Sequence, residues 1–520
     1  VRLALADASL PKWGHDAKDM ETAVIAAGGS LSGVTFDTML AGYLLDPSAA
    51  NFALAPLCQQ YLGSDLLGPV GEEADGQLFT ESWRAVAAEA AAVALLAPAM
   101  AERIERAGVQ RLLDEVELPL SSILARMQAR GVALDAGYLE KMAGSVRDQM
   151  ATLKAEIYRH AGEEFNLNSP PQLRTILYEK LRLSPGKRTP KGQHSTDASV
   201  LEKLRDQHPI VDALLQWREL DKLNSTYLEA LPRQVDPADG RLHTTFNQTG
   251  ATTGRLSSSN PNLQNIPVRG ELGRRIRRAF IPGSKDQLLV VADYSQIELR
   301  ILAHLSGDEG LKAAFASGAD VHTATAARVF GLPEDRVDPE LRRRAKMVNY
   351  GLAYGMEAFG LAQRLDIATD EAREIMDAYF DNFPRIREYL DRQVARAAAE
   401  GFTETILGRR RYIPELQAAN PRVRDMGRRM ALNAPIQGSA ADVFKLGMIE
   451  VDSALRGSLL DCRMLLTVHD ELVFEVASPQ VEEAAALVKG EMESAHELSV
   501  PLRADVGWGS NWAEAAPAGH

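Results

Sequence analysis

Cysteine is scarce in this sequence of 520 residues, which contains only Cys58 and Cys462. Two cysteines without the spacing of a metal finger exclude a disulfide scaffold and a cysteine-rich zinc site. Uncharged apolar runs of about 18 or more residues, which a membrane-spanning helix requires, are missing too. The closest stretch, "AVAAEAAAVALLAPAM", is interrupted by Glu89 and Pro98. We therefore expect a cytoplasmic protein with no membrane partner.

Positive charge is also in deficit, because 58 lysines and arginines face 71 aspartates and glutamates. Taken alone, the net charge of −13 argues against a nucleic-acid partner, whose phosphates are bound by cationic side chains. The cations are nevertheless clustered in short runs, namely "GRRIRR" (273–278), "RRRAK" (342–346), "GRRR" (408–411) and "RRM" (428–430). Local basic surfaces for a polyanion are therefore compatible with the acidic total.

Length and composition predict a multidomain globular protein, since a chain of this length holds about three or four domains. The apolar spacing is helical from about residue 115, strand-like over 241–310, helical over 320–435 and of β/α type near the end. The basic segment "SPGKRTPKGQHSTD" (184–197) is predicted to be a loop, either a solvated tip or a phosphate contact. Because the sequence starts at Val1 without an initiator methionine, we expect a fragment of a longer protein.

Two acidic residues stand where apolar strands end. Asp293 follows "LLVVA", and Asp470 follows "MLLTVH" at the start of a predicted hairpin that returns along "ELVFEV". Unpaired carboxylates at such places take a raised pKa or destabilise the fold, so we expect a cation to neutralise them. Oxygen ligands without His or Cys pairs favour Mg²⁺ or Mn²⁺. Two such ions, about 3.5–4 Å apart, can stabilise both the attacking and the leaving oxygen of a phosphoryl displacement.

Structural roles for the same residues remain open at this point. "DYSQIE" contains the pattern Ser295-x-x-Glu298 of a capping box, so Glu298 could close the first turn of its helix. Asp293 could be a turn residue, and "HD" also occurs in unrelated metal-dependent phosphohydrolases. The same unusual arrangement occurs twice, far apart in the sequence, and this repetition favours chemistry.

A cationic and aromatic stripe is predicted along one helix. "RRRAKMVNYGLAYG" places Arg342, Lys346, Tyr350 and Tyr354 at intervals of four residues, so they share one helical face. A triphosphate needs cations, and a base and sugar need a flat surface, so the stripe could bind a nucleotide end to end. The alternative is a solvated basic turn followed by two core tyrosines.

Five motifs in order give the sequence its resemblance to a known family. "DYSQIELR", "RRRAKMVNYGLAYG" and "VHDELVFEV" resemble motifs A, B and C of the family A DNA polymerases. "TGRLSSSNPNLQNIPVRGELGRRIRRAF" and "NAPIQGSAAD" match further signatures of that family. The similarity extends from about residue 115 to the end, and it is to the large, Klenow-type fragment of the bacterial enzymes.

The resemblance implies an α+β multidomain fold, in which a right-hand polymerase with thumb, palm and fingers follows a degenerate α/β RNase H-like 3′–5′ exonuclease domain. The implied segments are a vestigial exonuclease-like domain (1–115), the thumb with the start of the palm (116–240), the first part of the palm (241–315), the fingers (316–436) and the second part of the palm (437–520).

The implied activity is template-directed DNA synthesis by two-metal nucleotidyl transfer, in DNA repair and replication gap filling. The implied partners are primer-template DNA and dNTPs. By the same resemblance we expect a monomer in the bacterial cytoplasm, associated with the nucleoid.

The resemblance also assigns site residues. Asp293 and Asp470, with the carbonyl of Tyr294, would bind two Mg²⁺ ions, which Mn²⁺ could replace, and Glu471 would be an accessory catalytic carboxylate. Lys346 would be catalytic too, as the proton donor to pyrophosphate. The residues implied in nucleotide binding are Arg342, Lys346, Tyr350, Glu298, Gln296 and His322, and Glu298 would crowd the 2′ position of a ribonucleotide. The residues implied in DNA binding are Arg255, Tyr354, Arg429, Asn433, Gln437 and His469.

Proofreading is expected to be absent. In the stretch that resembles the last exonuclease motif, a Tyr-x-x-x-Asp pattern, the sequence reads Val86 to Ala90, so both functional side chains are missing. Asp16 could occupy another ligand position, but one acid cannot hold two divalent ions.

Two other functions compete with the polymerase. A non-catalytic primer-template binding module would not need both aspartates and Lys346. A relative of the single-subunit RNA polymerases would share parts of these motifs, but Glu298 argues against ribonucleotides.

Overall fold

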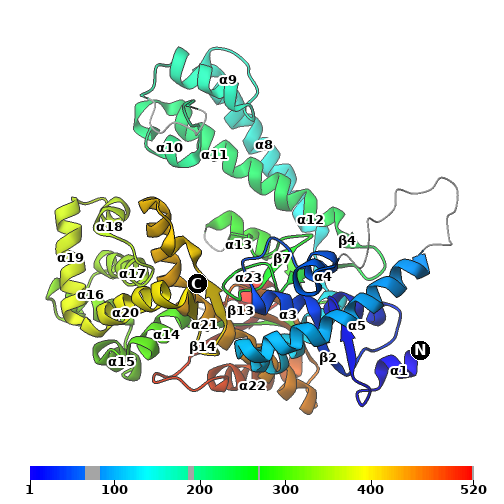
Figure 1. Cartoon of the computed structure of the whole chain (residues 1–520). Helices are drawn as coiled ribbons and strands as arrows, with labels where there is room; N and C mark the ends of the chain where they lie inside the picture. Colours follow the sequence, from blue (N-terminus) through cyan, green and yellow to red (C-terminus); the bar gives the residue numbers. More distant parts are fainter. Residues whose placement is uncertain (65–81, 185–191, 268–269, 518–520) are drawn as a thin grey trace.

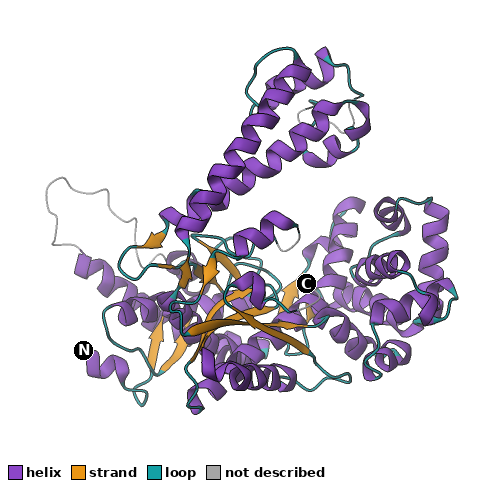
Figure 2. Cartoon of the chain, turned by 180° about the vertical axis from the view of Figure 1, so that it is seen from behind, coloured by secondary structure: helices purple, strands orange, loops and turns teal. Residues whose placement is uncertain are grey.

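The computed structural model describes residues 1–64, 82–184, 192–267 and 270–517. The cations of the predicted basic loop, at 187, 188 and 191, lie outside the described residues. Figures 1 and 2 show a body built around a twisted sheet, from which a helical arm and a helical lobe project separately.

The central sheet has the strand order β12-β13-β9-β14, and all its neighbouring strands are antiparallel. Its strands are β9 (Gln287–Tyr294), β12 (Cys462–Val468), β13 (Glu471–Ala477) and β14 (Ala504–Gly509). The apolar run of β9 is completely buried from Leu289 to Ala292, as expected of a short apolar strand covered on both faces. The register places Asp293 of β9 opposite Glu471 of β13 on one side and opposite Asp505 of β14 on the other. Three acidic residues therefore meet at one end of this sheet.

Helices pack on the sheet and form one apolar core with it. They are α7 (Leu118–Arg130), α14 (Ile297–Ser306), α21 (Pro421–Gly457), α22 (Val481–Ser494) and α23 (Trp512–Ala515). A second sheet has the order β4-β5-β3-β8, with β3 (Val132–Leu134), β4 (Val235–Asp236), β5 (Arg241–Leu242) and β8 (Phe280–Ile281). A separate hairpin of β6 (Thr245–Asn247) and β7 (Ser257–Ser259) contains Arg255 in its loop.

The arm is formed by two long helices, α8 (Ala136–Ala161) and α11 (Pro209–Leu223), which lie side by side (Figure 1). At its tip are α9 (Pro170–Arg174), η2 (Thr175–Lys180), α10 (Ala198–Glu202) and η3 (Arg205–Gln207). These helices share an apolar core of their own, which includes Leu177 and Leu214. Below it, η4 (Asn224–Leu228) and α12 (Ala230–Arg233) lead back to the body. The arm therefore falls within the segment predicted to be the thumb.

The lobe contains α15 (Glu309–Ala316), α16 (Val321–Phe330), α17 (Pro339–Ala353), α18 (Ala358–Leu365), α19 (Thr369–Asn382) and α20 (Pro384–Glu400), with η5 (Glu334–Arg336) between α16 and α17. The predicted hairpin follows as β10 (Phe402–Glu404) and β11 (Arg410–Tyr412), which pair antiparallel, and η6 (Pro414–Gln417) leads into α21. The lobe is thus the helical segment that the sequence predicts over 320–435.

The N-terminal segment is an α/β unit. Its elements are α1 (Arg2–Ala6), β1 (Lys12–Gly14), α2 (Ala17–Ala26), β2 (Val34–Asp37), α3 (Thr38–Leu45), α4 (Leu54–Leu62) and α5 (Ser82–Ala107), and β1 and β2 are parallel. Among the described helices, α5 is long and apolar enough to cross a membrane by length and composition. Its residues Leu96, Met100 and Ile104 are completely buried in a core shared with α3 and α4, so one face of the helix packs against the protein.

A buried ionic network joins three parts of the chain. Glu117, at the end of η1 (Leu113–Glu117), accepts hydrogen bonds from Arg409 Nη2 at 2.6 Å and from Lys445 Nζ at 2.7 Å. Arg409, in the turn between β10 and β11, also donates to Asp442 of α21 at 2.8 Å. All four side chains are at most 3% exposed. The network therefore fixes the hairpin and α21 against the body.

Candidate active site

The acidic end of the central sheet opens into a cavity of about 400 Å³. The backbone amide of Tyr294 donates to the carbonyl of Asp470 at 3.3 Å, so the two acidic segments are in direct contact. The lining residues come from both acidic segments, from the lobe and from two further parts of the chain, which contribute Arg277 and Asp505. They are Arg277, Asp293, Tyr294, Ser295, Gln296, Ile297, Glu298, His322, Arg342, Lys346, Tyr350, Val468, His469, Asp470, Glu471 and Asp505. The structure thus confirms that Asp293 and Asp470 share one site.

The hairpin turn between β12 and β13 holds Asp470 in place. Val468 pairs with Glu471, which leaves only His469 and Asp470 in the turn. His469 has a φ of 56°, in the left-handed region that such tight hairpin turns require. The turn confines Asp470 to the end of the sheet, beside the last residues of β9.

Glu471 is an anchored carboxylate. Its Oε1 accepts a hydrogen bond from Trp512 Nε1 at 2.6 Å, and its Oε2 lies 3.6 Å from Arg277 Nη1. Arg277, the last residue of α13 (Glu271–Arg277), also stacks over the Trp512 ring at 4.3 Å from the centroid. The nearby cation balances the charge of Glu471, and both of its carboxylate oxygens have a partner within the protein.

Asp470 is the acid whose environment calls for a cation. Burial raises the pKa of its carboxyl, and Asp293 raises it further, while Arg255 and His469 act in the opposite direction. Two carboxylates and a backbone carbonyl are oxygen ligands, which Mg²⁺ and Mn²⁺ prefer. Mg²⁺ in proteins is often held by only one or two carboxylates, with water and substrate phosphates completing the shell. The donor set at the open end of this sheet therefore fits such ions.

The predicted stripe lies on α17 and faces this cavity. Arg342, Lys346 and Tyr350 all line it, and the rings of His322 and Tyr350 lie 5.9 Å apart. Tyr354 is the C-cap residue of the helix, and its ring lies 6.4 Å from that of Tyr350. Both tyrosines are only partly buried. Tyr350 also packs against the apolar core, so it has a structural contact as well as a face on the cavity.

Glu298 does not form a capping box. The N-cap of α14 is Gln296, with a φ of 56° and no side-chain capping bond. The carboxylate of Glu298 instead accepts hydrogen bonds from Arg255 and from the hydroxyl of Tyr354. Burial raises the pKa of Glu298 to about 7, although the nearby Arg255 lowers it. Glu298 thus connects the predicted DNA ligand Arg255 to the end of α17.

His322 is a buried wall of the cavity. The amide nitrogen of Asn349 lies 3.1 Å from its Nδ1, and burial lowers the pKa of the imidazole to about 4. A neutral ring that accepts at Nδ1 carries its proton on Nε2. His322 is therefore a neutral hydrogen-bond donor at neutral pH.

The residues predicted to contact DNA lie farther apart than the residues predicted to bind the nucleotide. Arg429, Asn433 and Gln437 follow one another at intervals of four residues on α21. Arg429 lines a second cavity of about 350 Å³, between α21 and the lobe, and not the acidic cavity. His469 lines the acidic cavity, and Arg255 reaches it through Glu298. The structure therefore distributes these residues around the site.

Three residues at the site were missed by the sequence analysis. Asp505 is brought beside Asp293 by β14, Arg277 holds Glu471, and Asp320 pairs with Arg342. The run "GRRIRR" marked Arg277 only as basic, and "DVGWGSNW" contains Asp505. Neither pattern indicates a partner, because these contacts join segments far apart in the sequence.

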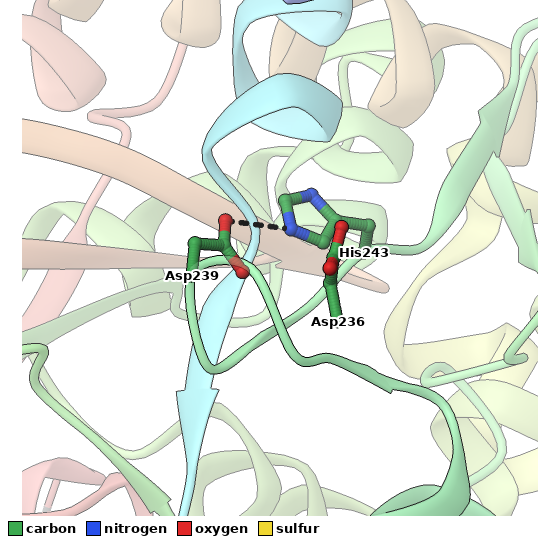
Figure 3. A group of neighbouring side chains, drawn as sticks. All are labelled: Asp236, Asp239 and His243. Atoms are coloured by element: carbon green, nitrogen blue, oxygen red, sulfur yellow. Dashed lines mark hydrogen bonds and ion pairs between the residues drawn. The ribbon is translucent and has the colours of Figure 1, made fainter.

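Another group of possible metal ligands lies away from the cavity (Figure 3). Asp236, Asp239 and His243 belong to the β4–β5 hairpin, and they form the one group of three such residues, among those described, whose ligand atoms all lie within 4.8 Å of one another. His243 Nε2 lies 3.0 Å from Asp239, and its Nδ1 donates to the carbonyl of Gln128 at 2.7 Å. Asp236 accepts from the amide of Ala238 at 2.8 Å. The bonds to Asp239 and to Ala238 are local bonds of this turn, whereas the bond to Gln128 joins the hairpin to α7. We assign no function to this group.

Known proteins are similar to this chain over almost its whole length. The profile described as DNA polymerase family A matches residues 136–514, and the profile described as the ribonuclease H-like domain of DNA polymerase I matches residues 1–67. DNA polymerase I of Mycobacterium tuberculosis (strain ATCC 25618 / H37Rv) is 46% identical over 520 residues, and the thermostable DNA polymerase I of Thermus filiformis is 47% identical over 516. Each alignment covers 98% of this chain, but the chain spans only 57% and 59%, respectively, of those relatives.

A solved structure agrees over the same length. The "POL domain of Pol1 from M. smegmatis complex with DNA primer-template and dNTP" superposes with a TM-score of 0.93 at 45% identity, covering 99% of this chain and 88% of that one. It supports the predicted fold class, a right-hand polymerase preceded by an RNase H-like domain. With the family profile matched over most of its length, the chain belongs to DNA polymerase family A.

Proposed function

We propose that this chain is the polymerase part of a DNA polymerase I, which adds dNTPs to a primer 3′-hydroxyl under the direction of a template. The observation that carries the proposal is the single cavity in which Asp293 and Asp470 face Arg342 and Lys346. Relatives named DNA polymerase I and a similar structure in complex with primer-template DNA and dNTP support it. We extend the proposal to DNA repair and gap filling by a monomer, as the family resemblance implies. Because the relatives named above are bacterial, we also propose that it acts in the bacterial cytoplasm, associated with the nucleoid.

The residues divide the reaction between them. Asp293 and Asp470, with the carbonyl of Tyr294, would hold two divalent ions, which when bound lower the pKa of the primer hydroxyl and stabilise charge on the phosphates. Arg342 and Lys346 bind the triphosphate, and Lys346 can pass a proton to the leaving pyrophosphate. Tyr350 lies against the sugar.

Selection against ribonucleotides would come from Glu298. Its carboxylate is held by Arg255 and Tyr354, so it cannot easily move away from a 2′-hydroxyl. Arg255, Tyr354, Arg429, Asn433, Gln437 and His469 remain the proposed contacts to DNA. Base pairing supplies the sequence, and these contacts need only position the duplex.

Extension of a labelled primer tests this function directly. We expect extension with dNTPs and Mg²⁺ or Mn²⁺, little with NTPs, and none with EDTA, because the carboxylates alone cannot activate the primer hydroxyl. Equal use of NTPs would favour an RNA polymerase relative. Tight primer-template binding without extension would favour a non-catalytic binding module.

The exonuclease-like segment is proposed to have no proofreading activity. Asp37, a nearby acid of this segment, is completely buried, and its carboxylate accepts four backbone N–H groups, from Asp16, Ala17, Met39 and Leu40. A carboxylate so fully used as a helix cap has little capacity left for a metal. Val86 and Ala90 stand exposed on α5, in the stretch that resembles the last exonuclease motif.

We therefore expect no release of mononucleotides from 3′-labelled single-stranded DNA in Mg²⁺ or Mn²⁺. Asp16→Ala serves as the control, because any trace of nuclease from a contaminant is unchanged in this variant. Mononucleotide release that co-purifies with the protein and disappears in Asp16→Ala would show a surviving exonuclease site.

A further inference from the structure

Arg342 is already occupied by a carboxylate of the same chain. Its Nη2 donates to Asp320 Oδ2 at 2.7 Å and its Nε donates to Oδ1 at 3.2 Å, so the pair is bidentate. Asp320 is the N-cap residue of α16, and its Oδ1 also accepts from the amide of Thr323 at 2.7 Å. The two side chains remain 45% and 35% exposed, so a ligand in the cavity can reach the guanidinium.

This pairing competes with the role of Arg342 at a nucleotide. A guanidinium presents its N–H groups as a planar fork, which fits two oxygens of one carboxylate or one phosphate. Asp320 occupies the Nε and Nη2 donors of that fork. A triphosphate that takes the same donors must first displace the carboxylate.

We propose that Asp320 is an internal competitor for the triphosphate, which holds Arg342 in the nucleotide-free protein and releases it when a dNTP binds. The inference rests on the proposed function, since it assumes that Arg342 binds the triphosphate. The pair lowers the apparent affinity for every dNTP to the same extent, because the competition involves the triphosphate and not the base. Asp320 is thus a positioning residue that tunes the dNTP concentration at which the enzyme works.

The expected size of the effect follows from the exposure of the pair. Exposed ion pairs are weak, so Arg342 is expected to spend a minor but appreciable part of its time free of Asp320. When the competent state is only partly populated, the apparent Kd rises in inverse proportion to that population. Removing the competitor should therefore lower the apparent Kd for dNTP by about two- to five-fold.

Asp320→Asn is the appropriate variant. Asparagine is as good an N-cap as aspartate, so α16 keeps its capping bond while the charged partner of Arg342 is lost. The matched control is Asp338→Asn. Asp338 is the N-cap of α17 and accepts from the amide of Leu341 at 2.8 Å, one turn before Arg342. This control removes the same charge from a cap near the same arginine.

The experiment is single-turnover incorporation of one dNTP on a primer-template by wild type, Asp320→Asn, Asp338→Asn, Arg342→Ala and the double variant Arg342→Ala/Asp320→Asn. Asp320→Asn is expected to lower the apparent Kd two- to five-fold, with a smaller change in the rate at saturating dNTP. Asp338→Asn should change the Kd by less than 1.5-fold. In the Arg342→Ala background, Asp320→Asn should have no effect.

Two results would overturn the competition. One is an unchanged or higher Kd in Asp320→Asn, at a Tm close to that of wild type. The other is an equal gain in the Arg342→Ala background, which would mean a general charge effect. If the wild type extends no primer, the proposed function fails, and the competition is then measured by the binding of tripolyphosphate. Asp320→Asn should tighten that binding by the same factor. An unchanged affinity for tripolyphosphate would refute the competition.

Discussion

Asp470→Ala is expected to lower the rate of nucleotide incorporation by about 10³-fold or more, while primer-template binding changes little. Asp470 is one of the five acidic residues that line the cavity at the end of the sheet, and it lies beside the last residues of β9. Without it, the site loses one of the two carboxylates that would neutralise a divalent cation. The DNA contacts proposed on α21 are separate from this carboxylate, so binding should survive.

Stability should respond in the opposite direction to activity. Burial and the neighbouring Asp293 raise the pKa of Asp470 above its ordinary value, so at neutral pH this carboxyl group costs stability in the metal-free protein. The Tm of Asp470→Ala measured in EDTA should therefore be equal to that of wild type or higher. Such a loss of activity without a loss of stability is the usual mark of a site shaped for function.

The measurements are single-turnover extension, equilibrium binding to a labelled primer-template and thermal unfolding in EDTA. Asp461→Ala is the matched control, because Asp461 is an exposed acid just before β12, at the other end of that strand. It should extend primers at the wild-type rate. An Asp470→Ala protein that retains more than about a tenth of the wild-type rate would remove Asp470 from the catalytic centre.

The second large effect is expected at Glu117, far from the chemistry. Glu117→Ala should lower the free energy of unfolding by about 3–5 kcal/mol, because it leaves buried cations without their carboxylate. Lys445 and Arg409 both bond to Glu117, and Gln248 donates to it at 2.9 Å. Only Arg409 keeps another carboxylate, that of Asp442, so the charge of Lys445 would be the least compensated.

The pH dependence of this stability has a definite sign. Burial alone would raise the pKa of Glu117, but Lys445 and Arg409 lower it to about 2. A carboxyl group with a lowered pKa in the folded state contributes stability above its ordinary pKa, near 4.5, and loses it as the pH falls from there toward 2. The wild type should therefore lose stability over that range more steeply than Glu117→Ala does.

Chemical and thermal unfolding at pH 7 and at pH 4 measure both effects. The matched control is Glu115→Ala, which removes an exposed glutamate of the same η1 segment, paired with Arg111 at 2.6 Å. Exposed helical pairs contribute only about 0.3–0.5 kcal/mol, so this control should change little. Equal losses for the two variants would mean that the buried network adds no net stability.

The sequence alone was sufficient to predict those parts of the site that depend on side-chain type and on position within a strand or helix. Asp293 and Asp470 each follow an apolar strand, and a strand end is where a buried sheet meets solvent. The spacing of four residues among Arg342, Lys346 and Tyr350 is a property of any helix, and these three indeed line one cavity. The resemblance of the motifs then implied the family, which the comparisons confirm.

Local patterns failed where a competing tertiary contact was stronger. Ser295-x-x-Glu298 satisfies the pattern of a capping box, but Arg255 and Tyr354 hold Glu298 elsewhere. The predicted stripe also extends to Tyr354, whereas the helix ends at Ala353, and here the cause is local. Gly355, with a φ of +71°, stops it there.

What the sequence by itself determined is the chemistry available: oxygen ligands at two strand ends, a cationic helix face and the family. Only the tertiary structure decided which partner each charge takes. The register of the sheet places Asp505 beside Asp293. The packing of α13 and α23 brings Arg277 and Trp512 to Glu471. The arrangement of α16 and α17 pairs Arg342 with Asp320. The physical reason is that an ionic or hydrogen-bonded pair forms only when two groups lie within a few ångströms of each other, and this distance does not follow from their separation in the sequence.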